Sequence, residues 1–138
     1  MFSLKDKVAL VTGASSGLGV RFAEVLAENG AVVVLVARRA DRLDALKARI
    51  EKSGGRAVAV EADVRDRKAM ELAYDAAEKA FGTVTILINN ACVVHSGRAV
   101  ELAEEEWRRV LSTNLDAVFY WAQEASPDAR CRQGRRHR

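Results

Sequence analysis

The stretch Thr12-Gly13-Ala14-Ser15-Ser16-Gly17-Leu18-Gly19 follows directly on the apolar run 8–11. We expect a buried strand to end there in a glycine-rich turn that opens a helix, which is the arrangement that binds the pyrophosphate of a dinucleotide. The free N–H groups and the positive end of such a helix point toward the anion. The motif lacks the Gly-Lys-Ser/Thr ending of a P-loop, which argues against nucleoside triphosphate hydrolysis.

The three glycines of this turn have separate expected roles. Gly13 allows the tight turn, Gly17 lets the backbone approach a phosphate, and Gly19 lets the helix lie close against the strand. The alternative is that they only form a strand-to-helix turn, because glycine turns are common. The cofactor-binding residues predicted in this turn are Thr12, Gly13, Ser15, Ser16, Gly17, Leu18 and Gly19.

The rest of the chain alternates between strand and helix patterns. Apolar runs predict strands at 8–11, 31–37, 57–60 and 84–88, with amphipathic helices between them and a long helix from about residue 104. This alternation predicts an α/β fold, a Rossmann-like doubly wound parallel sheet with helices on both faces. Right-handed crossovers give the strand order 3-2-1-4, with the ligand at the carboxyl ends of strands one and four.

Composition and charge exclude several other classes of protein. No apolar stretch approaches the roughly 20 residues that cross a bilayer, and the N-terminus does not resemble a secretory signal, so we expect a cytoplasmic protein without membrane contact. The net charge of +3 is misleading, because the last twelve residues contribute +4 and leave −1 for the remainder. Nucleic-acid binding is therefore not expected. The two cysteines form no metal or redox motif.

From Lys5 to about Ala125, the chain resembles the short-chain dehydrogenase/reductases, a family of NAD(P)-dependent oxidoreductases. Four motifs match in order and spacing: the turn 12–19, the pair Asp63-Val64, the run Asn89-Asn90-Ala91, and Asn114 within the last helix. The resemblance implies hydride transfer between a nicotinamide cofactor and a small-molecule carbonyl or alcohol substrate.

The resemblance also implies roles for individual residues near the cofactor. The Asp63 carboxylate accepts a hydrogen bond from the adenine amino group, or alternatively caps a helix, and Val64 offers an apolar wall to the ring. The short amide side chains of Asn89 and Asn90 tie strand ends together or approach the cofactor ribose, or alternatively form plain turn structure. Of this run, Asn90 and Ala91 are predicted to bind the cofactor. Cys92 stands where the family has glycine, and we interpret it as a buried, small apolar residue rather than a nucleophile.

Cofactor choice is expected to depend on the end of the second strand. An NAD enzyme usually places an acid there to hold the ribose 2′-hydroxyl. This strand ends instead at Ala37 and is followed by Arg38 and Arg39, and guanidinium groups suit bidentate contact with a phosphate. The expected cofactor is therefore NADP, with NAD possible. The alternative is two surface arginines beside Asp41 and Asp44.

Most of the family's catalytic residues do not match any residue of this chain. Of the tetrad of Asn, Ser, Tyr and Lys, the resemblance assigns only Asn114 as catalytic. Tyr74 and Tyr120 are each followed four residues later by glutamate rather than lysine. We expect a truncated, inactive oxidoreductase, or alternatively a non-catalytic dinucleotide-binding or interaction module.

The chain ends in an arginine-rich segment that loses helical periodicity after Ser126-Pro127. We expect an incomplete dinucleotide-binding domain over 1–125 and a basic, disordered tail over 126–138. A sheet that stops before the fifth strand leaves strand four as an open edge, which invites pairing with other chains. With an apolar stripe on the long helix that includes Trp107, Phe119 and Trp121, this predicts self-association.

Overall fold

The computed structural model describes residues 2–134. Its centre is a four-stranded, fully parallel sheet in the order β3-β2-β1-β4, as the sequence predicts. The strands are β1 (Val8–Thr12), β2 (Val32–Ala37), β3 (Ala57–Glu61) and the short β4 (Ile86–Ile88). Non-consecutive strands β1 and β4 therefore lie side by side, and their carboxyl ends meet at one edge of the sheet.

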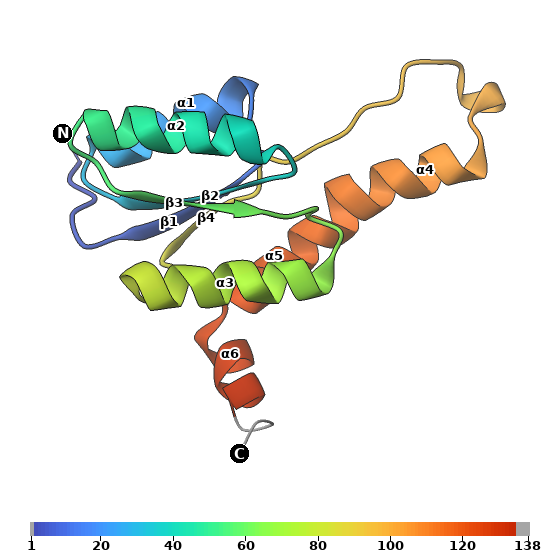
Figure 1. Ribbon diagram of the computed structural model, residues 1–138. Coiled ribbons are helices and arrows are strands. Elements are labelled where there is room, and N and C mark those ends of the chain that lie inside the picture. The colour runs from blue at the N-terminus through green and yellow to red at the C-terminus, as the bar shows by residue number, and fades with distance from the viewer. Residues whose placement is uncertain (1, 135–138) are drawn as a thin grey trace.

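Helices cover both faces of this sheet (Figure 1). Helices α1 (Gly17–Glu28) and α2 (Ala40–Lys52) lie on one face, and α3 (Arg67–Phe81) and α5 (Ala117–Ala125) lie on the other. A long loop after β4 leads through the short 3-10 helix η1 (Ala99–Glu101) to α4 (Glu104–Leu111), which projects away from the sheet. The π-helical turn η2 (Ser112–Asp116) joins α4 to α5, and α6 (Pro127–Gly134) follows.

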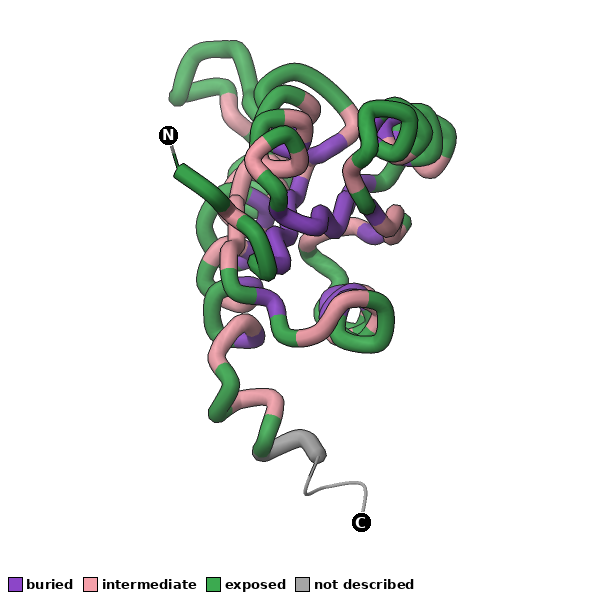
Figure 2. The backbone as a smooth tube through the Cα atoms, turned by 90° about the vertical axis from the view of Figure 1, so that its left-hand side faces the viewer, coloured by how far each residue is buried: buried purple, intermediate pink, exposed green. Residues whose placement is uncertain are grey.

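The side chains of the central strands divide between two cores because successive residues of a strand point to opposite faces. In β2, Val33 and Leu35 pack with α1 and α2, whereas Val34 and Val36 pack with α3 and α5. Every residue of β1 and β2 is buried, which explains their continuous apolar sequence. Figure 2 shows the buried segments gathered at the centre of the molecule.

Helix ends follow the sequence signals in most places. The carboxylate of Asp66 accepts hydrogen bonds from the backbone N–H groups of Lys68 and Ala69 and so caps α3. Gly82 ends the same helix with a φ of 104°. Asp41 is not the N-cap of α2, a position that Arg39 occupies, but it lies in the first turn, where its charge favours the helix dipole.

The long last helix of the sequence is interrupted by η2, and the predicted apolar stripe is only partly exposed. Trp107 and Phe119 are 52% and 60% exposed, but Trp121 is fully buried, so its predicted exposure is wrong. Its indole N–H donates to the carbonyl of Val64 at 2.9 Å, and its backbone carbonyl accepts from the Tyr74 hydroxyl at 2.7 Å. This face of α5 therefore packs against α3 and the sheet.

The segment 127–134 is helical, although its sequence predicts no regular structure. Arg130 of α6 explains the docking: its guanidinium binds Asp75 at 2.7 Å and Glu78 at 2.5 Å, both on α3, and Glu124 of α5 at 3.2 Å. Charge pairing therefore replaces the missing apolar periodicity. Residues 135–138 of the predicted tail lie outside the described residues. Within residues 2–134, the helices are too short or too polar for any of them to span a bilayer.

Candidate functional site

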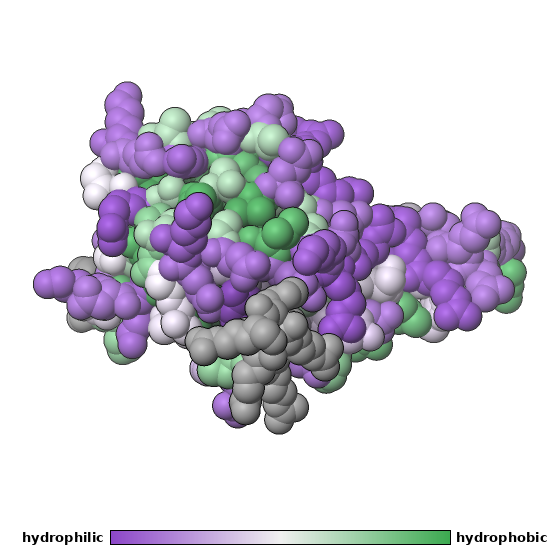
Figure 3. Space-filling model, turned by 60° about the horizontal axis from the view of Figure 1, so that its bottom comes forward, coloured by the Kyte–Doolittle hydropathy of each residue, from purple (hydrophilic) through white to green (hydrophobic). Residues whose placement is uncertain are grey.

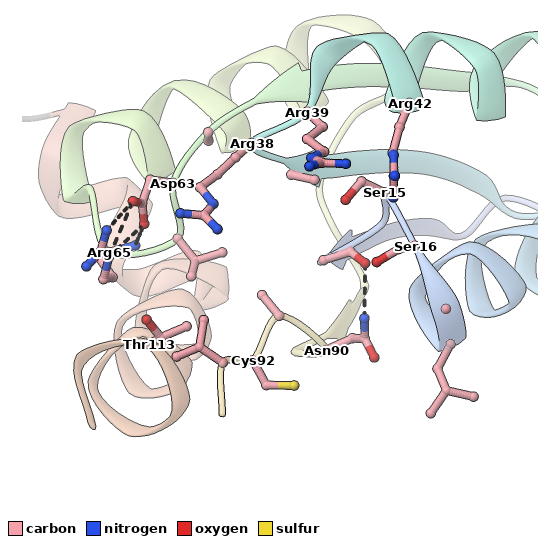
Figure 4. A pocket seen from close by; sticks show the side chains of 18 of the residues that line it. Ser15, Ser16, Arg38, Arg39, Arg42, Asp63, Arg65, Asn90, Cys92 and Thr113 are labelled. Atoms are coloured by element: carbon pink, nitrogen blue, oxygen red, sulfur yellow. Dashed lines mark hydrogen bonds and ion pairs between the residues drawn. The ribbon is translucent and has the colours of Figure 1, made fainter. Parts of the chain in front are cut away.

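A cavity of about 490 Å³ opens at the carboxyl ends of the strands. Its walls come from the glycine turn after β1, the ends of β2 and β3, the loop after β4, and the α4–η2 segment (Figure 4). This is the position at which open α/β sheets bind ligands, where the strand order reverses. The lining residues are Gly13, Ser15, Ser16, Gly17, Leu18, Ala37, Arg38, Arg39, Arg42, Ala62, Asp63, Val64, Arg65, Asn90, Ala91, Cys92, Val93, Arg109 and Thr113.

The first two glycines of the turn adopt backbone conformations that favour glycine. Gly13 has a φ of +65°, and a Cβ there would lie 2.8 Å from the Cα of Ala91. Gly17 has a φ of +56°, but an added Cβ would meet nothing within 4 Å. Gly13 therefore brings the turn against the loop after β4, whereas Gly17 presents its backbone to open space at the cavity wall.

Thr12 and Gly19 lie beneath the cavity and are absent from the residues described as lining it. Gly19 is buried at the start of α1, where a Cβ would lie 2.6 Å from the Asn90 amide nitrogen. Thr12 is 1% exposed, and its hydroxyl accepts hydrogen bonds from the backbone N–H groups of Asn90 and Ala91, each at 3.1 Å. Asn90 Nδ2 returns a hydrogen bond to the Gly13 carbonyl at 3.2 Å. Together these contacts fix the glycine turn to the end of β4.

The N-terminus of α1 has the properties of an anion site. Ser16 occupies the N-cap position, but its side chain makes no capping hydrogen bond, and the first turn holds no acid. By contrast, α3 has a fully formed cap at Asp66. The first N–H groups of α1 therefore lack a side-chain acceptor at the place where the cavity wall is formed by Ser15, Ser16 and Gly17.

Five arginines and one acid line the cavity, which makes it strongly electropositive. Arg38 and Arg39 follow β2 as predicted, and Figure 4 shows Arg39 and Arg42 beside Ser15. Sequence reasoning missed Arg42, Arg65 and Arg109. Arg42 lies in the first turn of α2, four residues after Arg38, and Arg65 directly follows the Asp63-Val64 pair.

Asp63 lies at the end of β3 and does not cap α3. Its carboxylate accepts the backbone N–H of Arg65 at 2.9 Å and the Arg65 Nη2 at 2.7 Å. The hydrogen bonds from Arg65 hold the pKa of Asp63 below its ordinary value against the opposing effect of burial. The group is therefore an ionised acceptor near neutral pH. Val64 lines the cavity beside it.

Asn114 acts on the loop after β4. Its amide donates to the Val93 carbonyl at 2.7 Å and accepts the Val93 N–H at 2.9 Å, which is a complete two-way clamp. Asn114 lies within the π-helical turn η2, a distortion often found at functional sites. It is not among the residues that line the cavity, whereas its neighbour Thr113 is.

The same loop has two further attachments to α4. Arg109 Nη2 donates to the Val94 carbonyl at 3.3 Å, and His95 Nδ1 lies 3.1 Å from Glu106. Hydrogen bonds from Arg109 and then His95 hold the pKa of Glu106 below its ordinary value. The predicted burial of Cys92 is wrong: it is an exposed free cysteine that lines the cavity.

The described cavity lining contains neither tyrosine nor lysine. Tyr74 is buried under α5, and burial raises the pKa of its phenol well above its ordinary value. Tyr120 faces Arg67, whose guanidinium carbon lies 3.9 Å from the ring centroid. The walls thus supply cations and backbone donors, together with one ionised carboxylate, and they suit a phosphorylated ligand.

Residues 7–135 match the family model for short chain dehydrogenases. The chain belongs to the short-chain dehydrogenase/reductase family, whose members use NAD(P). It is similar to a gluconate 5-dehydrogenase of Gluconobacter oxydans, with 40% identity over 123 residues that make up 89% of this chain and 48% of that protein. It is also 41% identical to an NADP-dependent (R)-specific alcohol dehydrogenase of Lentilactobacillus kefiri, over 85% of this chain and 46% of that protein.

Solved structures show the same likeness. A dehydrogenase/reductase from Sinorhizobium meliloti 1021 superimposes with a TM-score of 0.86 at 40% identity, over 89% of this chain and 49% of that one. A short-chain type dehydrogenase/reductase from Mycobacterium marinum gives a TM-score of 0.86 at 35% identity, over 90% of this chain and 50% of that one. The chain spans about half the length of the curated relatives it matches.

The Thr12 hydroxyl predicts a measurable difference between two conservative variants. Thr12→Val keeps the shape but leaves the N–H groups of Asn90 and Ala91 without their acceptor, so we expect the free energy of unfolding to fall by about 1–3 kcal/mol. Thr12→Ser keeps the hydroxyl and is the matched control, with a smaller loss. Urea denaturation followed by circular dichroism checks this, and equal losses in the two variants would contradict the role of the hydroxyl.

Proposed function

We propose that this chain binds an NADP-type dinucleotide and supplies the cofactor-binding part of an oxidoreductase that acts on a small carbonyl or alcohol. The observation that carries the proposal is the electropositive cavity at the carboxyl ends of the strands, formed around the N-terminus of α1. When bound, the nicotinamide supplies hydride transfer, and the residues of this chain bind and orient the cofactor.

The residues present fit the chemistry of each part of such a cofactor. The pyrophosphate needs hydrogen-bond donors, which the first N–H groups of α1 and the open backbone of Gly17 offer beside Ser15, Ser16 and Leu18. The adenine needs an acceptor and an apolar wall, which Asp63 and Val64 offer. Asn90 and Ala91 line the side toward the ribose, and Thr12, Gly13 and Gly19 hold the turn in place.

Preference for the 2′-phosphorylated cofactor is supported by the end of β2. No acid stands at Ala37, and Arg38 and Arg39 are exposed at the cavity wall. Arg38 makes no hydrogen bond or ion pair among the residues that the structure describes, so its guanidinium has capacity for a phosphate. The relative from Lentilactobacillus kefiri is described as NADP-dependent, which agrees with this preference.

A proton-transfer group for the substrate oxygen is not found in this chain. The family arrangement expected from the sequence needs a tyrosine with a lysine four residues later, and neither tyrosine has one. Asn114 does not titrate near neutral pH, and its clamp on Val93 supports a role in positioning the loop beside the cofactor. A non-catalytic dinucleotide-binding module therefore stays the second candidate.

We also propose that copies of the chain associate through β4 and the α4–α5 segment. Among residues 2–134, β4 pairs with β1 only, and no described strand covers its other edge. Trp107, Leu115 and Phe119 are exposed along the segment that projects from the sheet, and Figure 3 shows hydrophobic side chains at its lower edge and tip. Burial of such side chains is favourable at about 25 cal/mol for each Å².

The arginines after β2 provide the direct test of the cofactor proposal. Arg38→Ala with Arg39→Ala is expected to weaken NADP(H) about ten- to a hundredfold, because charged hydrogen bonds of this kind contribute about 1.5–3 kcal/mol. NAD(H) lacks the 2′-phosphate and should lose far less. Titration calorimetry with both cofactors checks this, with Arg98→Ala as a control arginine outside the cavity. Equal affinities of the unmodified chain for NADP and NAD would contradict the preference.

Turnover distinguishes the two candidate functions. Without the tyrosine, lysine and serine, we expect the purified 138-residue chain to show no nicotinamide turnover with ketones or alcohols, because general acid–base groups typically contribute 10²–10⁴-fold each. Nicotinamide absorbance measures the rate. Turnover that follows the purified chain and disappears in Asn114→Ala would overturn this expectation and would establish an enzyme with an unidentified proton donor.

Self-association is tested by removing one exposed aromatic side chain. Phe119→Ser is expected to shift the population toward monomer by about ten- to a hundredfold in dissociation constant, since a buried aromatic ring contributes about 1.5–3 kcal/mol. Leu72→Ser, on an exposed position of α3, is the control and should leave the population unchanged. Sedimentation velocity reports the oligomeric state, and a monomeric unmodified chain at high concentration would refute the proposal.

A further inference from the structure

Asp63 is the one acid among the arginines that line the cavity, and it is bound by Arg65, two positions later in the sequence. Arg65 reaches back to Asp63 with Nη2 at 2.7 Å from Oδ2 and Nε at 3.1 Å from Oδ1, while its backbone N–H also binds Oδ1. The two groups therefore form a bidentate pair within one turn of chain. The Asp63 side chain is 32% exposed, so the pair lies at the cavity wall rather than in the core.

A second guanidinium lies near the same carboxylate. The charge of Arg38 contributes to holding the pKa of Asp63 low, although Arg38 forms no ion pair with it. Figure 4 shows Arg38 beside Asp63 and pointing toward the cavity, with Arg65 on the far side of the carboxylate. Asp63 thus has two cationic neighbours and binds only one of them.

This arrangement makes Arg65 and Arg38 alternatives for one acceptor. If Arg65 did not bind Asp63, the Asp63 carboxylate would lie without a partner beside the Arg38 guanidinium, and the two would form the bidentate pair that both groups favour. Arg38 would then be held by Asp63 and turned from the cavity. An unpaired Asp63 would also repel a ligand phosphate in the same cavity. Pairing with Arg65 removes both effects.

We infer that Arg65 determines cofactor specificity from a distance: by occupying the Asp63 carboxylate, it keeps Arg38 available to the 2′-phosphate of the cofactor. The inference rests on the proposed dinucleotide function and adds a positioning residue to it. Arg65 need not touch the phosphate. Its contribution passes through Asp63, and it distinguishes the phosphorylated from the unphosphorylated ribose.

The test compares two fragments of the cofactor that differ by the 2′-phosphate. Adenosine 2′,5′-bisphosphate and adenosine 5′-monophosphate are titrated into the full chain by calorimetry, and the ratio of their dissociation constants is the preference. Arg65→Met is expected to lower this preference by roughly two- to fivefold, the range for a partly exposed charge pair. Arg67→Met removes the same charge two residues away, outside the cavity lining, and should leave the preference unchanged.

The second variant identifies the route of the effect. Asp63→Asn removes the charge that competes for Arg38, so Arg65→Met with Asp63→Asn is expected to regain the preference of the unmodified chain. A merely structural role of Arg65 would weaken both ligands alike and would not be rescued in this way. If Arg65→Met fails to fold, Arg65→Gln takes its place with and without Asp63→Asn, and a preference that Arg65→Gln leaves unchanged overturns the inference.

The possible failures are distinguishable. An unmodified chain that binds neither fragment overturns the dinucleotide site and this inference with it. Binding without preference between the two fragments leaves the dinucleotide site and overturns the assignment of Arg38 to the 2′-phosphate. A preference that Arg65→Met does not change, or that Asp63→Asn does not restore, overturns the inference alone.

Discussion

The close contact between the glycine turn and the end of β4 is the constraint on which the candidate site depends. Two strands that are far apart in sequence end side by side, and the Thr12 hydroxyl holds the first residues after β4 by two backbone hydrogen bonds. No side chain fits at Gly13 or Gly19 without displacing this contact. This close contact of backbone on backbone thus sets where α1 begins, and with it the position of its N–H groups.

Charge is distributed over the molecule in two separate patterns. Around the cavity, arginines come from the ends of β2 and β3, from α2 and from α4, and a single carboxylate lies among them. On the far side, Arg130 is surrounded by three carboxylates from α3 and α5. The first pattern leaves cationic capacity for a ligand, whereas the second is satisfied within the chain. The same residue type therefore marks a candidate site in one place and a docking contact in the other.

Sequence patterns predict the sheet, its strand order and the region of the site because these depend on local signals. Buried parallel strands such as β2 are continuous apolar runs, and Gly13 and Gly17 mark the turn by their backbone needs. The burial of Trp121 could not be predicted, since it depends on which face of α5 meets α3. The Asp63–Arg65 pair could not be predicted either, because charged residues close together in sequence do not reveal which of them a side chain binds.

The two tryptophans occupy opposite environments, and this gives the molecule a built-in optical contrast. Trp121 lies in a dry core with its indole N–H bonded to the backbone of Val64, a residue of the cavity wall. Trp107 is about half exposed to solvent on α4, which projects from the sheet. Emission at short wavelength therefore reports on the core beneath the cavity, and emission at long wavelength reports on the outer helix. One chain without added dyes carries a separate light signal for each region.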